Sequence, residues 1–388
     1  MSNPSVPCSA FSVLHGGKRI AGRRYAPKGG SGVPVIISHG FMSSMRETAR
    51  YAERFAAMGY AAYVFDFLGG APKNESEGDF EKMSVQTEAN DLLAVMDYVS
   101  SQSADKAKKL ILCGCSQGGF VSALVAAAHS SRVDKLILFY PALCIPDDAR
   151  RGQMQFFKFD PKNVPDRVSA FGGRLAIGRR YIEDAQSLDA LAAIAPYKGD
   201  VLLLHGTADK VVPQGYAEDA LAVYQARPSG TAQLLRLTGA GHGFKPREDD
   251  LAFAVIEQFL AGRREILAVD VRLTKTTFRF EQGMDVRTLA FCGTATGPQF
   301  SGEIQPGAAD VQKRKWGRPV EFCARYAIKG RDSTGTPCTV RITNRTTDGT
   351  HWQPSLETDS PALAAWNGAE VKAVLEMRKV GPVVHLFM

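Results

Sequence analysis

The chain lacks the features that define several broad classes of protein. Its 388 residues contain no apolar run as long as the roughly 18 residues that a membrane-spanning helix requires. The N-terminal residues show no basic start followed by an apolar segment, so we expect no signal peptide. The seven cysteines are odd in number and scattered, which argues against a disulfide framework and favours a reducing cytoplasm as the location. No pair of cysteines has zinc-like spacing, and we expect no metal site.

An excess of positive charge is present but small. The net charge is +7, and most of it falls in residues 263–388, where 18 Lys and Arg stand against 13 Asp and Glu. The densest basic stretch is VQKRKWGRP, residues 311–319. Because no interleaved aromatic and basic residues surround it, we favour a solvated hairpin over a nucleic-acid surface. We therefore expect neither a nucleic-acid nor a membrane partner.

Two patterns of apolar residues divide the chain into two domains. Residues 1–264 alternate continuous apolar runs with helical patterns, which predicts an α/β domain whose mostly parallel sheet has helices on both faces. Between about 144–196 this rhythm gives way to a stretch rich in Pro, Gly and Phe, which predicts an inserted cap above the strand ends. Residues 265–388 alternate apolar and polar positions between Gly-containing turns, which predicts an antiparallel, barrel-like all-β domain.

The stretch KLILCGCSQGGFVSALVAAA contains a candidate nucleophile, Ser116. Glycines two residues before and two residues after it form the pattern G-x-S-x-G between an apolar strand and an alanine-rich helix. The sharp turn between strand and helix leaves no room for side chains at Gly114 and Gly118, and it raises the serine hydroxyl above the sheet. The pattern alone occurs by chance, but its position between a strand and a helix favours a catalytic serine.

A serine nucleophile requires a base and an acid that orients the base. Asp209 directly follows one buried strand and His242 follows the next, in the order and the position that this fold requires. Taken singly, Asp209 could cap a turn and His242 could be a surface-loop histidine. The combination with Ser116 favours a catalytic triad. Backbone N–H groups of Gln117 and Phe41 are the predicted donors for the oxyanion.

The motifs SHGF, GCSQGG, HGTADKVVP and GAGHGF resemble those of the α/β-hydrolase superfamily, and the chain is most similar to its cinnamoyl (feruloyl) esterase-like group. The resemblance covers about residues 10–262. It implies a serine hydrolase with a small inserted cap, with its triad at Ser116, Asp209 and His242 and its oxyanion donors at Phe41 and Gln117.

The C-terminal part more faintly resembles a small β-barrel family of unknown function, which implies a fold and no activity. Three roles stay open for it: binding part of the substrate, forming a homodimer, or shielding the mouth of the active site.

These observations predict a serine hydrolase that cleaves carboxylic esters, with aryl (cinnamoyl) or short acyl groups, through an acyl-enzyme. Its partner is a small-molecule ester, and no cofactor is expected. The same triad also serves thioesterases, lactonases and carbon–carbon bond hydrolases, so these alternatives stay open. A non-catalytic binding module and a nucleic-acid-binding barrel are the alternatives from other classes.

Overall fold

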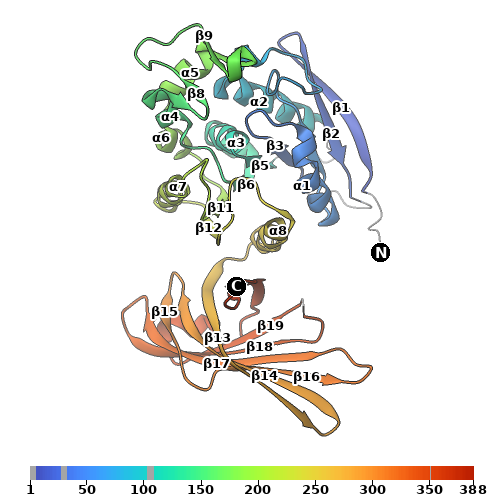
Figure 1. Cartoon of the computed structure of the whole chain (residues 1–388), viewed down its shortest axis with the longest axis vertical. Helices are drawn as coiled ribbons and strands as arrows, with labels where there is room; N and C mark the ends of the chain where they lie inside the picture. The colour runs from blue at the N-terminus through green and yellow to red at the C-terminus, as the bar shows by residue number, and fades with distance from the viewer. Residues whose placement is uncertain (1–5, 28–32, 103–108, 350) are drawn as a thin grey trace. The chain divides into compact units, whose positions relative to one another are not determined.

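The computed structural model describes residues 6–27, 33–102, 109–349 and 351–388. The chain forms two compact units, Met1–Asp249 and Asp250–Met388, each of which is drawn in Figure 1. The sequence predicts a division after residue 264, which lies just past the end of helix α8 (Pro246–Leu260). Residues 1–5, on which part of the expectation about a signal peptide depends, lie outside the described residues.

The first unit is built on an eight-stranded sheet. In spatial order its strands are β1 (Cys8–His15), β2 (Lys18–Tyr25), β4 (Ala62–Phe65), β3 (Val35–Ser38), β5 (Leu110–Cys115), β6 (Val133–Phe139), β11 (Asp200–Gly206) and β12 (Ala232–Leu237). The β1–β2 and β2–β4 pairs are antiparallel, and the other neighbouring strands are parallel. The mostly parallel sheet expected from the sequence is therefore confirmed, and an antiparallel hairpin extends one edge.

Helices cover both faces of this sheet, which explains why its central strands are apolar throughout. The main helices are α1 (Met45–Ala57), α2 (Val85–Gln102), α3 (Gln117–Ala128) and α7 (Gly215–Gln225). On one face Leu112 and Leu138 belong to a buried cluster with Phe120 of α3. From α1, Tyr51 stacks on Phe139, the residue next to Leu138 and hence on the other face, with ring centroids 4.6 Å apart. Both faces are thus removed from water.

A segment of short elements lies between β6 and β11, in the range predicted for a cap. It contains α4 (Ile145–Arg151), β7 (Gln153–Met154), β8 (Phe157–Lys158), β9 (Arg167–Ala170), η3 (Phe171–Gly173), β10 (Leu175–Gly178), α5 (Arg179–Gln186) and α6 (Ala190–Ile194). We call residues 144–196 the insert. Its aromatic residues differ in environment, because Phe157 is fully buried whereas Phe171 is 61% exposed. Two further 3-10 turns of the first unit are η1 (Phe80–Lys82) and η2 (Ser130–Arg132).

The second unit is an antiparallel all-β structure, as its period-two pattern predicted. Its strands are β13 (Glu265–Glu281), β14 (Met284–Thr296), β15 (Phe300–Ile304), β16 (Ala309–Lys315), β17 (Glu321–Asp332), β18 (Pro337–Thr346), β19 (Gln353–Thr358), β20 (Lys372–Glu376) and β21 (Val383–Phe387), with η4 (Pro361–Trp366) between β19 and β20. They follow the order β19-β18-β17-β15-β14-β13-β21-β20, and β16 pairs with β14 and β17. The end strands β19 and β20 approach each other, so the sheet curves into a barrel-like form around a core that includes Trp366 and Ile342.

Two further features bear on the composition. All seven cysteines lie in the described parts of the chain as free thiols, and Cys113, Cys115, Cys144 and Cys338 are buried. Within the described ranges, no helix is both long enough and apolar enough to cross a membrane.

A buried ionisable cluster lies at one edge of the second unit. His385 on β21 is 6% exposed, and its Nδ1 lies 3.1 Å from Glu265 Oε1 and its Nε2 3.6 Å from Glu376 Oε2. Burial alone would lower the pKa of His385, but the two carboxylates outweigh that effect and raise the pKa to about 9. The histidine is therefore a cation at neutral pH in the folded chain.

This cluster predicts a loss of stability at alkaline pH. Because the folded pKa exceeds the usual value near 6.5, the stabilisation is complete below that value and is lost as the pH rises through about 9. At about 1.4 kcal/mol per pKa unit, the free energy of unfolding of the second unit should fall by roughly 3 kcal/mol between pH 6 and pH 10. Denaturant titrations of the wild type and of His385→Gln test this. A fall of equal size in the variant would show that other groups cause it.

Candidate active site

The turn between β5 and α3 places Ser116 in an uncommon backbone conformation. Its φ of 53° and ψ of −120° are rare for a residue with a side chain, and such values are found where the surroundings enforce them. A Cβ on Gly114 would lie 2.3 Å from the carbonyl oxygen of Gly118, and a Cβ on Gly118 would lie 2.2 Å from that of His39. The two glycines of the motif are thus required by backbone packing, and they fix the serine at the N-terminus of α3.

The structure brings the three predicted triad residues together. His242, on the loop after β12, has its Nε2 3.0 Å from Ser116 Oγ and its Nδ1 2.8 Å from Asp209 Oδ2. Asp209 lies on the loop after β11, the strand next to β12 in the sheet. With Nδ1–H donating to the carboxylate, Nε2 is left to accept the serine hydroxyl proton. This tautomer is the one that a general base requires.

Asp209 is held as a carboxylate although its side chain is fully buried. Burial alone would raise its pKa. The hydrogen bond from His242 and the backbone N–H groups of Val211 and Val212, which donate to Oδ1 over 2.8 and 2.9 Å, lower the pKa below its ordinary value on balance. The negative charge of Asp209 therefore faces Nδ1 of His242.

His205, a rival histidine in the same motif, also reaches Asp209. Its Nε2 donates to the carbonyl oxygen of Val212 over 2.9 Å and lies 3.5 Å from Asp209 Oδ2. The ring is completely buried, and burial lowers its pKa, so His205 stays neutral and supports the loop after β11. Its contact with Asp209 could not be inferred from the sequence.

The two predicted oxyanion donors come from neighbouring strands. Phe41 follows β3 and Gln117 follows β5, and these parallel strands are adjacent at the point where the strand order reverses. A Cβ on Gly40 would come within 3.1 Å of Ser116 Cβ, so the loop after β3 passes directly beside Ser116. Among the described residues, neither the Phe41 N–H nor the Gln117 N–H has a hydrogen-bond acceptor. Both are available to an oxygen bound beside Ser116.

His39 holds the loop that carries Phe41. Its Nδ1 donates to the carbonyl oxygen of Gly40 over 2.8 Å, and its Nε2 accepts the backbone N–H of Phe67 over 3.2 Å. Burial lowers the pKa of this fully buried ring. Both ring nitrogens are thus engaged in structural hydrogen bonds.

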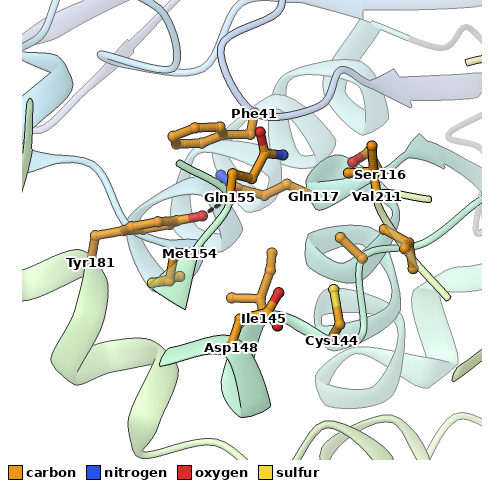
Figure 2. Close-up of a pocket in the computed structure, with 12 residues that line it drawn as sticks. Phe41, Ser116, Gln117, Cys144, Ile145, Asp148, Met154, Gln155, Tyr181 and Val211 are labelled. Atoms are coloured by element: carbon orange, nitrogen blue, oxygen red, sulfur yellow. Dashed lines mark hydrogen bonds between the residues drawn. The ribbon is translucent and has the colours of Figure 1, made fainter. Parts of the chain in front are cut away.

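A narrow pocket opens beside Ser116, and the insert forms one side of it (Figure 2). Its lining residues are Phe41, Ser116, Gln117, Ala142, Cys144, Ile145, Asp148, Met154, Gln155, Tyr181, Val211 and Val212. The free volume at its centre is about 30 Å³, enough for about two water molecules by the same measure. Within the described residues, no group of three or more His, Cys, Asp and Glu side chains is arranged to hold a metal ion.

Sequence reasoning missed the side-chain contacts of Gln117. Its Nε2 donates to Oε2 of Glu88 over 2.8 Å, and its Oε1 accepts the hydroxyl of Tyr181. A signal for Glu88 does exist, because this carboxyl interrupts the apolar stripe that α2 buries, between Val85 and Leu92. No comparable signal marks Tyr181, which lies in the irregular part of the chain.

This combination of fold and site defines a class of protein. An open, mostly parallel sheet with helices on both faces, a serine at the turn after β5, and an acid and a histidine on the loops after the last two strands together describe the α/β-hydrolase fold. The first unit has this fold.

Comparisons with known proteins agree with this assignment. Residues 33–170 match the model of a hydrolase family described as serine aminopeptidase, S33. The structure of Est1E from Butyrivibrio proteoclasticus with ferulic acid bound is 26% identical, with a TM-score of 0.59 over 65% of this chain and 98% of Est1E. Alpha/beta hydrolase domain-containing protein 10 from mouse is 19% identical, with a TM-score of 0.54 over 66% of this chain and 99% of its own, and supports the fold alone. No curated protein sequence matches.

The close packing at Gly118 predicts that Gly118→Ala damages both stability and activity. The added methyl group would collide with the carbonyl oxygens of His39 and Ser38, at 2.2 and 2.6 Å, and would displace the loop that carries Phe41. We expect a loss of about 1–3 kcal/mol in the free energy of unfolding and a fall in kcat of about 10²-fold, comparable to the loss of one oxyanion donor.

Gly215→Ala is the matched control, because a Cβ at Gly215 would meet no atom within 4 Å. Denaturant unfolding and ester hydrolysis of the two variants are the measurements. Equal behaviour of the two variants would show that the turn tolerates a side chain.

Proposed function

We propose that the chain is a serine hydrolase that cleaves carboxylic esters through an acyl-enzyme. The proposal rests above all on the continuous hydrogen-bonded series from Ser116 Oγ through His242 to Asp209, next to two backbone N–H groups without acceptors among the described residues. The family model and the likeness to Est1E support hydrolysis as the reaction class. The roles given to individual residues follow from their geometry.

The proposed reaction has two halves. In the first, His242 takes the proton of Ser116 while Oγ attacks the ester carbonyl, and the N–H groups of Phe41 and Gln117 stabilise the oxyanion. The alcohol then leaves with the proton from His242. In the second half, water attacks the acyl-enzyme with His242 again as the base, which releases the acid and restores Ser116. Asp209 keeps the imidazole in one tautomer throughout, and no cofactor takes part.

The pocket favours substrates with a short acyl group. Its free volume at the centre is only about 30 Å³, so a long acyl chain must displace side chains of the lining, among which Met154 and Gln155 are flexible. The ferulic acid bound to Est1E supports the alternative of an aryl acyl group. Because both groups react through the same triad, the relative rates of the two ester classes decide between them.

The first test is hydrolysis of p-nitrophenyl acetate, p-nitrophenyl octanoate and methyl ferulate by the wild type and by Ser116→Ala. We expect the wild type to cleave at least one ester and the variant to lose at least about 10³-fold in kcat/KM, because the nucleophile is gone. Ser122→Ala is the matched control, since Ser122 is a fully buried serine of α3, the helix that Ser116 precedes, and does not line the pocket.

A serine-directed fluorophosphonate gives a second readout, which should modify Ser116 in the wild type. If the wild type neither hydrolyses an ester nor reacts with the phosphonate, the first unit is a binding module and the proposal is wrong. Cleavage of thioesters in preference to the oxygen esters would instead favour a thioesterase.

The second test concerns acyl length. We expect kcat/KM for the acetate to exceed that for the octanoate by at least about 10-fold, because each excess methylene meets a filled pocket. Met154→Ala should narrow this difference, since it removes a flexible side chain from the lining. Methyl ferulate cleaved as efficiently as the acetate would show that the pocket opens for aryl groups and would contradict the short-acyl preference.

A further inference from the structure

The side chain of Gln117 is fixed at both of its ends. Gln117 is the first residue of α3, and its side chain is almost completely buried. Its Nε2 donates to Glu88 Oε2 over 2.8 Å, and its Oε1 accepts the hydroxyl of Tyr181, the hydrogen bond drawn as a dashed line in Figure 2. A glutamine whose amide donates to one group and accepts from another has a single orientation. The residue that carries one oxyanion N–H is therefore held by two partners outside the turn.

Tyr181 also contacts the residue that carries the other oxyanion N–H. Its ring stacks on that of Phe41, with the centroids 5.5 Å apart and the planes inclined by 12°. Tyr181 belongs to α5 in the insert, and it is buried. Burial raises the pKa of its hydroxyl well above the ordinary value, so the hydroxyl keeps the proton that it donates to Gln117. One side chain of the insert thus contacts both Gln117 and Phe41.

Glu88, on α2, is the other hydrogen-bond partner of the Gln117 side chain. The residue is 1% exposed, Oε2 accepts from Gln117, and Oε1 is buried without a hydrogen bond among the described residues. Burial, with a smaller contribution from the charge of Asp91, raises the pKa of Glu88 to about 8. An apolar side chain would fill this position in the helix at a lower cost of desolvation. A purely structural role therefore gives no reason for a carboxyl group here.

We propose that Glu88 is a positioning residue for the oxyanion hole, which acts through the side chains of Gln117 and Tyr181. The carboxyl orients the Gln117 amide, the amide holds the Tyr181 hydroxyl, and the Tyr181 ring fixes Phe41. Donors that are fixed before the reaction stabilise the transition state more than the bound ester, and small displacements weaken them strongly. The inference rests on the function proposed above, and it adds a residue that touches no reacting atom.

The test compares two substitutions of Glu88. Glu88→Met keeps the length of the side chain but removes the acceptor, whereas Glu88→Gln removes the ionisable group and keeps an acceptor oxygen for Gln117. We expect kcat of Glu88→Met to fall about 10- to 100-fold with KM within about twofold of the wild type, because the lost interaction acts in the transition state. Glu88→Gln should restore most of kcat.

Asp91→Asn is the matched control. Asp91 is a buried acid of the same helix, and its Oδ2 accepts the backbone N–H of Leu68 over 2.9 Å rather than a group of the active site. We expect its kcat to equal that of the wild type whatever its melting temperature. A loss of kcat in Asp91→Asn as large as that in Glu88→Met would mean that any damage to α2 lowers activity, which would overturn the proposal.

Tyr181→Phe removes the other hydrogen bond of the Gln117 side chain. It tests the proposal even if Glu88→Met does not fold. It removes the hydroxyl and keeps the ring against Phe41, so we expect a fall in kcat of about 10-fold. In the double variant Glu88→Met/Tyr181→Phe, the loss should be smaller than the product of the two single losses, because both act through Gln117. Multiplicative losses would mean that the two residues act independently, contrary to the proposal.

The outcomes separate this inference from the proposed function. If the wild type neither hydrolyses esters nor reacts with the fluorophosphonate, the proposed function fails and the role of Glu88 fails with it. If the wild type is active and Ser116→Ala is not, while Glu88→Met and Tyr181→Phe keep kcat within about twofold, the role of Glu88 alone is wrong. A rise in KM without a fall in kcat would also contradict it, since that result indicates a loss of substrate binding.

Discussion

The close approach of three backbone segments is the constraint on which the site depends. The end of β5, the start of α3 and the loop after β3 come so near to one another that Gly114 and Gly118 have no room for a Cβ atom. Within this packing Ser116 has a positive φ, and the loop that carries Phe41 lies beside it. The strands β11 and β12 are parallel to β5, so the loops that follow them lie at the same edge of the sheet as Ser116. These loops carry Asp209 and His242.

Much of the first unit could be predicted because its signals are local. Apolar runs between helical patterns indicate the parallel strands, and their ends locate Ser116, Asp209 and His242. The hydrogen bonds that join Glu88, Gln117 and Tyr181 could not be predicted, since these residues are far apart in the sequence and meet only when α2 and the insert pack beside the turn between β5 and α3. The contact of His205 with Asp209 escaped for a similar reason, because it depends on how the loop after β11 folds back.

In the second unit the class of structure was predictable and its topology was not. Alternating apolar and polar positions indicate antiparallel strands, and these are present. Nothing in the alternation tells which strands pair, and β15 and β16 both lie between β14 and β17 in the observed sheet. The cluster of Glu265, Glu376 and His385 likewise depends on strand pairing, because it forms where β13, distant along the chain, pairs with the C-terminal hairpin of β20 and β21.

The hydrogen bond between Tyr181 and Gln117 has a consequence for how such enzymes diversify. Segments inserted between the same two strands are commonly regarded as exchangeable modules that alter specificity while the scaffold supplies the chemistry. Here the insert provides Tyr181, whose hydroxyl donates a hydrogen bond to the side chain of Gln117, the first residue of α3. A chimera that receives a foreign insert without a hydroxyl donor at this position would leave Oε1 of Gln117 without its partner. On the role proposed for this contact, an exchange of the insert would then change the rate of the reaction as well as its specificity.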